Sequence, residues 1–191
     1  MTVKILAFAG SLRKDSYNKK LAKIIAKSAE KAGAEVTLVE LNDYPMPLFN
    51  EDDESKDGIH PNALKFKQLM NESDGFLIAS PEYNGAYSGV LKNVVDWASR
   101  QADGEGMLES FKGKYATLFA TSPGAFGGLR GLNHLRILLS GIGTTVTADQ
   151  VAIPKAQDAI TDDGQLASEK RQASVDRITK NLVDTLAKLK A

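Results

Sequence analysis

The stretch VKILAFAGSLRKDSYNKKL, residues 3–21, passes from an apolar run to a polar turn and then into a helical pattern. The run up to Gly10 is short and rich in residues that favour a β-strand. After the turn, apolar residues recur at Leu21, Ile24 and Ile25, which is the spacing of one helix face, and Gly33 supplies a C-cap. The stretch therefore predicts a buried strand, a turn and a helix.

The same order of strand and helix occurs five times along the chain. Short apolar strands that alternate with helices indicate a parallel sheet covered on both faces. Five strands favour the flavodoxin-like order 2-1-3-4-5 over the six-stranded dinucleotide-binding fold. We therefore expect one α/β domain over residues 1–191, a flavodoxin-like three-layer sandwich. The remaining strands are expected at 35–41, 75–80, 114–122 and 144–153, the remaining helices at 62–73, 88–99, 129–141 and 167–191, and a polar loop at 42–61.

The composition excludes several kinds of protein and of site. Lys and Arg together number 24, as do Asp and Glu, so the formal net charge of the 191 residues is zero, which disfavours a nucleic-acid partner. The absence of cysteine excludes disulfides, thiolate nucleophiles and Cys-bound metals, and it fits a cytoplasmic location. The N-terminal apolar run is shorter than a signal-peptide core, and no run approaches the roughly 20 apolar residues that cross a membrane.

A binding site is expected at the turns that follow the first, third and fourth strands. Ligands of an open parallel sheet bind outside the carboxyl ends of its strands, near the point where the strand order reverses. The three turns read GSLRKDSYN at 10–18, SPEYNGAYSG at 80–89 and TSPGAFGGLRG at 121–131. All three are rich in Gly, hydroxyls and small polar groups, and we expect them to lie side by side.

The first turn leads into a helix N-terminus, whose unpaired N–H groups and dipole suit an anion such as phosphate. Ser11 and Ser16 can donate hydroxyl hydrogen bonds, Arg13 can add a charge-assisted contact and Asn18 can donate its amide. Helix capping explains the Ser and Asn residues equally well. The spacing matches neither the P-loop nor G-x-G-x-x-G, which disfavours an NTPase and a simple dinucleotide-binding site.

The second and third turns have the composition of a pocket for a flat, partly polar ring. Two tyrosines, Tyr83 and Tyr87, and Asn84 suit such a ring and a polyol, although ordinary turn packing explains them as well. The third turn contains four glycines, which allow the backbone to approach a ligand closely, or which simply form a loop. These glycines are Gly124, Gly127, Gly128 and Gly131.

Taken together, the three turns resemble those of the NAD(P)H-dependent FMN reductase family of flavodoxin-like proteins, which includes quinone, chromate and azo-dye reductases. The resemblance covers nearly the whole chain. Its most specific part is PEYN at 81–84, followed by LKN at 91–93 and DW at 96–97. The chain departs from the family at Ser88, where Pro is usual before Gly. Ser88 can still cap the following helix.

The resemblance implies a bound FMN, NADPH or NADH as co-substrate, and hydride transfer through the flavin to a quinone, azo dye, chromate or free flavin. It implies no catalytic side chain, because the flavin carries the chemistry. It also implies a homodimer or homotetramer. The residues implied for FMN are Ser11, Arg13, Ser16 and Asn18 at the phosphate, Pro81, Glu82, Tyr83 and Asn84 along the ribityl chain and ring edge, and Ser122, Gly124, Gly127 and Gly128 as backbone donors at the pyrimidine end.

Two other functions stay open at this point. A flavodoxin-type electron carrier would bind FMN without turning over NAD(P)H, although such carriers are typically acidic and this chain is neutral. A protein that uses the fold only for interaction or sensing would not need intact residues in all three turns.

The remaining polar and aromatic features are expected to be structural. We expect no metal site, a structural His134, a solvated His60, a solvated loop at EDDE (residues 51–54) and a Trp97 that packs on the sheet.

Overall fold

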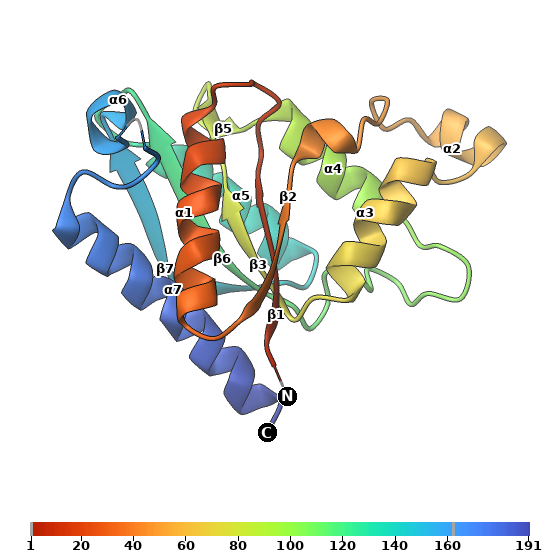
Figure 1. The fold of residues 1–191 in the computed structure, drawn as a ribbon. Helices are drawn as coiled ribbons and strands as arrows, with labels where there is room; N and C mark the ends of the chain where they lie inside the picture. The colour runs from red at the N-terminus through yellow and green to blue at the C-terminus, as the bar shows by residue number, and fades with distance from the viewer. Residues whose placement is uncertain (1, 162) are drawn as a thin grey trace.

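The computed structural model describes residues 2–161 and 163–191, in which helices and strands alternate as the sequence predicts (Figure 1). The strands are β1 (Lys4–Ala9), β2 (Glu35–Val39), β3 (Gly75–Ala79), β4 (Glu82–Tyr83), β5 (Ala86–Tyr87), β6 (Tyr115–Ser122) and β7 (Thr145–Pro154). The helices are α1 (Tyr17–Lys31), α2 (Glu51–Asp57), α3 (Pro61–Asn71), α4 (Gly89–Ala98), α5 (Leu129–Gly141), α6 (Ala156–Ala159) and α7 (Glu169–Leu189), with a 3-10 turn, η1, at Leu41–Asp43.

The main sheet has five parallel strands in the order β2-β1-β3-β6-β7. Numbered by their place in the five repeats, this is the order 2-1-3-4-5, so the predicted flavodoxin-like topology is confirmed. The central strand β3 is GFLIA, and all five of its residues are buried. Such a continuous apolar run is expected where helices cover both faces of a parallel sheet.

Two hydrophobic cores lie on opposite faces of this sheet. Ile5 and Ala7 of β1 point to one face and pack against α1 and α7, whereas Leu6 and Phe8 point to the other and pack against α3, α4 and α5. This alternation follows from the two-residue period of a strand. The three-layer arrangement is therefore as predicted. In Figure 1 the strands end at the top, which is where the three turns lie, and both chain termini are at the bottom.

The segment expected to be a polar loop at 42–61 contains most of the 3-10 turn η1 and the whole of the short helix α2. The acidic run EDDE forms the first turn of α2, so the prediction of a solvated loop there is wrong, although none of the α2 residues is buried. Asn50 caps the helix by accepting a 3.1 Å hydrogen bond from the Asp52 N–H. Acidic side chains at a helix N-terminus also interact favourably with its dipole, and this explains why the run is helical.

The predictions for Trp97 and the two histidines need correction. Trp97 is buried beneath the 45–50 segment, because its Nε1 donates a 2.8 Å hydrogen bond to the Pro47 carbonyl oxygen and its ring meets that of Phe49 edge-on at 5.1 Å. His60 is half-buried and caps α3, its Nδ1 accepting from the Asn62 N–H at 3.2 Å. His134 is exposed on α5 and so does not contribute to packing.

None of the helices in the described part of the chain is both long enough and apolar enough to cross a membrane.

Candidate functional site

The three turns meet at the carboxyl edge of the sheet because β1, β3 and β6 are direct neighbours. The Gly10 N–H donates a 3.0 Å hydrogen bond to the Ala79 carbonyl, which ties the first turn to the end of β3. The Ser80 N–H donates a 2.8 Å bond to the Phe119 carbonyl, which ties the second turn to β6. The predicted convergence of the three turns is therefore confirmed, and Figure 1 shows them at the same end of the molecule.

The first turn leaves polar groups available at the N-terminus of α1. Ser16 occupies the N-cap position and is 4% exposed, but its side chain makes no capping hydrogen bond. Ser11 is also buried, and its Oγ accepts only a long 3.4 Å contact from the Arg13 N–H. The Arg13 side chain is exposed. Capping therefore does not explain Ser16, and the turn brings two hydroxyls, a guanidinium and a positive helix end together, which is a combination suited to an anion.

Asn18 does not belong to this set of available groups. Its Nδ2 donates to the Thr121 carbonyl at 2.9 Å, and its Oδ1 accepts from the Thr121 N–H at 3.0 Å. The residue is only 4% exposed. These two bonds link the first turn to the end of β6, and the contact between Asn18 and phosphate that the resemblance implies stays a prediction.

The second turn is a β-hairpin that the sequence analysis did not identify. Strands β4 and β5 pair antiparallel, with Asn84 and Gly85 between them at φ values of 53° and 83°. Positive φ at both positions is the signature of a type I′ turn, for which Asn-Gly is the preferred pair, so the NG dipeptide was a usable signal. The hairpin exposes the Tyr83 side chain. Tyr87 is half-buried against the hydrophobic core on the side of the sheet that α3, α4 and α5 cover.

Glu82, which the resemblance places along the ribityl chain, binds the start of α5. Its carboxylate accepts from the Gly131 N–H at 3.1 Å and from Arg130 Nε at 2.8 Å. Burial alone would raise the pKa of Glu82, but the hydrogen bonds from Gly131 and Arg130 outweigh it and hold the pKa below its usual value. The carboxylate is therefore ionised, and it fastens the hairpin to α5. Pro81, which precedes it, is buried.

In the third turn, two of the expected donor glycines are required by packing. A Cβ at Gly127 would lie 2.5 Å from the Ile153 carbonyl carbon, and one at Gly128 would lie 2.7 Å from the Ala120 Cβ. Both residues are buried, and the Gly127 N–H is already directed at the Gly124 carbonyl at 3.3 Å. Close packing thus accounts for both glycines, and their expected role as backbone donors to a ligand stays a prediction. Ser122 is half-buried and Gly124 is exposed, so these two residues stay accessible.

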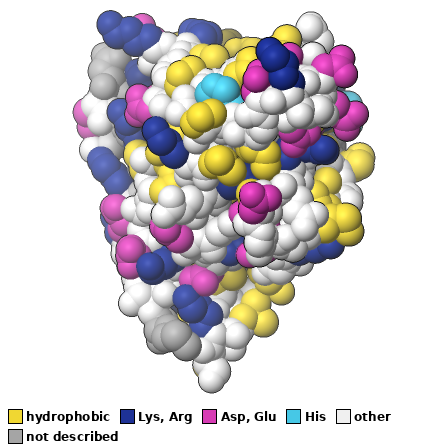
Figure 2. Space-filling model, turned by 90° about the vertical axis from the view of Figure 1, so that its right-hand side faces the viewer, with side chains coloured by type: hydrophobic (Ala, Val, Ile, Leu, Met, Phe, Trp, Pro, Cys, Tyr) yellow, Lys and Arg dark blue, Asp and Glu magenta, His cyan; other side chains and the backbone are white. Residues whose placement is uncertain are grey.

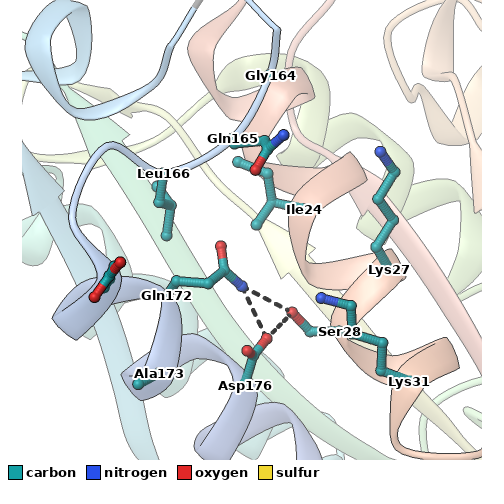
Figure 3. A pocket seen from close by; sticks show the side chains of 11 residues that line it. Ile24, Lys27, Ser28, Lys31, Gly164, Gln165, Leu166, Gln172, Ala173 and Asp176 are labelled. Carbon is teal, nitrogen blue, oxygen red and sulfur yellow. Dashed lines mark hydrogen bonds between the residues drawn. The ribbon is translucent and has the colours of Figure 1, made fainter.

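A hollow of about 530 Å³ lies elsewhere, between α1, α7 and the 164–166 segment (Figure 3). Ser28 Oγ donates to Asp176 Oδ1 at 2.5 Å, and Gln172 Nε2 donates to the same oxygen at 2.8 Å. These polar groups bond to one another across the two helices, so they form a helix–helix contact. None of the residues that line this hollow belongs to the three turns.

Within the described residues, no group of three or more His, Asp or Glu side chains is placed to hold a metal ion.

Comparison with known proteins gives concordant results. A family model described as NADPH-dependent FMN reductase matches residues 3–158. The chain is 35% identical over 169 residues to an NAD(P)H-dependent FMN reductase of Pseudomonas aeruginosa, covering 88% of this chain and 86% of that protein. It is 39% identical over 136 residues to a 2-hydroxy-1,4-benzoquinone reductase of a Burkholderia species, covering 71% and 69%. The solved structure of FerB, a flavoenzyme NAD(P)H:(acceptor) oxidoreductase from Paracoccus denitrificans, superposes with a TM-score of 0.83 at 32% identity over 98% of both chains.

Proposed function

Because this chain belongs to the NADPH-dependent FMN reductase family, we propose that its three turns hold FMN at the carboxyl edge of the sheet for the reduction of a quinone. The protein is an NAD(P)H-dependent, FMN-containing oxidoreductase. When bound, FMN supplies the redox chemistry, accepting a hydride equivalent from the nicotinamide and passing two electrons to the acceptor. The chain's own residues bind and orient the cofactor and leave room for the two substrates.

The phosphate end of FMN is assigned to Ser11, Arg13 and Ser16. The observation that carries this assignment is the Ser16 hydroxyl, which sits at the N-terminus of α1 without making a capping hydrogen bond. A phosphate there would receive hydroxyl and backbone donors, the helix dipole and the guanidinium of Arg13. These are the groups that a dianion requires, so the residues present fit the cofactor.

The ribityl chain and the ring are assigned to the accessible parts of the second and third turns. Tyr83 and Asn84 are exposed at the tip of the hairpin, and Pro81 forms a buried base beneath it. Of the four residues expected in the third turn, Ser122 and Gly124 are accessible, and backbone N–H groups there can stabilise the negative charge that develops at the pyrimidine end on reduction. Two side chains hold the turns in place through hydrogen bonds, Asn18 to Thr121 and Glu82 to Gly131. Close packing of the third turn depends on Gly127 and Gly128.

The acceptor class and the assembly are parts of the same proposal. The name of the Burkholderia relative supports a quinone as acceptor. Figure 2 shows hydrophobic side chains at the surface of the face beside α2, α3 and α4, interspersed with charges of both signs. Exposed hydrophobic residues include Leu48 in the segment before α2, Leu64 of α3 and Met107 in the loop after α4. Such a surface suits contact with a second copy of the chain, and we propose a homodimer or homotetramer.

Two further expectations stay predictions within this proposal. Residues 1–191 form one flavin-binding domain, and the protein acts in the cytoplasm. The electron-carrier alternative is not favoured by any observation, since the matched family and relatives are reductases.

A visible absorption spectrum tests the proposal most directly. The purified protein is incubated with FMN, freed of excess flavin, and then treated with NADPH or NADH followed by a quinone. We expect a bound-flavin spectrum that is bleached by the nucleotide and restored by the quinone. Flavin that binds without being bleached would indicate an electron carrier, and a protein that retains no flavin would contradict the proposal.

A further inference from the structure

We propose that Asn18 is a positioning residue that holds the phosphate end of the flavin site at a fixed place relative to the ring end. The inference rests on the proposed function, because it assumes that the three turns hold FMN. It differs from the role that the family resemblance implies for Asn18, which is direct contact with the phosphate.

The geometry of the Asn18 amide leads to this inference. Both ends of the amide are bonded to the backbone of one residue, Thr121, with Nδ2 to the carbonyl oxygen at 2.9 Å and Oδ1 to the N–H at 3.0 Å. The side chain thereby pairs with Thr121 as a neighbouring strand would. The Thr121 hydroxyl continues the connection by donating a 2.9 Å bond to the Ile153 carbonyl of β7.

The two ends of this link lie in the two halves of the site. Asn18 is two residues beyond Ser16, in the first turn of α1, and Thr121 immediately precedes Ser122 in the third turn. FMN spans both halves, so its phosphate can be bound well only if their separation is fixed before it arrives. The Asn18–Thr121 pair joins them across 103 residues of sequence.

A direct contact with phosphate would require the amide to leave Thr121. Asn18 and Thr121 are 4% and 2% exposed, so the Thr121 N–H and carbonyl would then be left unpaired and shielded from water. Leaving two buried backbone groups unpaired costs more than one additional hydrogen bond to a phosphate contributes. The amide is therefore expected to stay on Thr121 when FMN is bound.

The first test compares FMN with riboflavin, which lacks the phosphate. Asn18→Ala is expected to weaken FMN binding about tenfold or more and riboflavin binding much less, since only FMN needs the phosphate end to be held in place. Ser28→Ala is the matched control, because Ser28 is equally buried on α1, is bonded to Asp176 of α7 (Figure 3) and lies away from the turns. It should lower stability but keep the preference for FMN. An unchanged preference in Asn18→Ala would contradict the proposal.

The second test separates positioning from direct contact and uses the unaltered protein. Hydrogen exchange of the Thr121 amide is followed by NMR, without flavin and with FMN. We expect the amide to be protected in both states, since Asn18 Oδ1 holds it throughout. Protection that is lost when FMN binds would show that the amide has moved to the phosphate, and would overturn the proposal.

The same two measurements distinguish failure of this inference from failure of the proposed function. A Thr121 amide that exchanges freely without flavin contradicts the Asn18 link, whatever the protein binds. A protected Thr121 amide in a protein that does not bind FMN contradicts the proposed function instead.

Discussion

The Ser88 hydroxyl donates a 2.6 Å hydrogen bond to the carbonyl oxygen of Gly10. The same oxygen atom, Ser88 Oγ, also accepts from the Leu91 N–H at 3.3 Å and so caps α4. Gly10 directly follows β1 and is the residue at which the first turn begins. One buried hydroxyl therefore fastens the start of α4 to the start of the proposed phosphate site.

Ser88→Ala is expected to lower the free energy of unfolding by about 1–3 kcal/mol, because the Gly10 carbonyl loses its partner and α4 loses its cap. Urea unfolding of the flavin-free protein measures this. Ser88→Pro should also fold, since the φ of −71° at this position suits a proline ring, but it should be destabilised as Ser88→Ala is. Ser99→Ala, which removes a hydroxyl at the other end of α4, serves as the control and should have a smaller effect. Equal effects at the two positions would contradict a special role for the Ser88–Gly10 bond.

Arg13→Ala is expected to weaken FMN binding about tenfold to a hundredfold and to leave the fold intact. The side chain is exposed, so its removal leaves no buried group without a partner. Lys14→Ala changes the charge of the same turn equally and should affect binding much less, because a point charge lacks the planar fork that matches a phosphate. Fluorescence titration with FMN measures both variants. If the two lose affinity equally, Arg13 contributes only through overall charge.

Glu82→Gln tests how the contribution of the Glu82 charge to protein stability depends on pH. The pKa of Glu82 lies below its ordinary value of 4.5, so the stabilisation by its charge is complete above pH 4.5 and is lost as the pH falls through the lower pKa of the folded protein. The difference in unfolding free energy between wild type and variant is expected to be about 1 kcal/mol at neutral pH, since Arg130 is largely exposed and the pair is partly screened. This difference should shrink below pH 4.5.

Asp184→Asn provides the comparison for Glu82. It removes a carboxylate from an exposed pair with Lys180 on α7, far from the turns, and should change stability by only a few tenths of a kcal/mol. A Glu82→Gln difference that stays constant down to pH 3 would show that the Glu82 charge does not stabilise the hairpin.

Gly127→Ala should destabilise the protein by about 3 kcal/mol or more, because its φ is +61° and the new Cβ would lie 2.5 Å from the Ile153 carbonyl carbon. Gly124→Ala should change stability by less than about 0.5 kcal/mol, since the atom nearest to its Cβ would be Ser122 Oγ at 3.7 Å. Thermal unfolding without flavin measures both variants. Comparable stability of the two would show that the third turn rearranges more readily than its packing indicates.

The sequence alone determined the layers, the sheet order and the edge at which the three turns meet. Apolar runs of strand length and helical periodicity are local patterns, and β1 with α1 illustrates both within residues 3–31. The sequence analysis did not predict the β4–β5 hairpin, although Asn84-Gly85 is a strong local turn signal. It could not predict where Trp97 packs, because Phe49 and Pro47 approach it from a segment that has no periodicity of its own.

Only the tertiary structure decided which polar side chains of the three turns bond to distant parts of the fold and hold the turns together. Asn18 bonds to a residue 103 positions away, and Glu82 to one 49 positions away. Both partners are backbone groups, which every residue possesses, so the pairing leaves no pattern in the sequence. From the sequence alone, Ser16 and Asn18 are equally suited to bind phosphate, since both are polar residues of one turn. Both are 4% exposed, and only their hydrogen bonds separate them: the Asn18 amide bonds to Thr121, whereas the Ser16 side chain makes no capping bond.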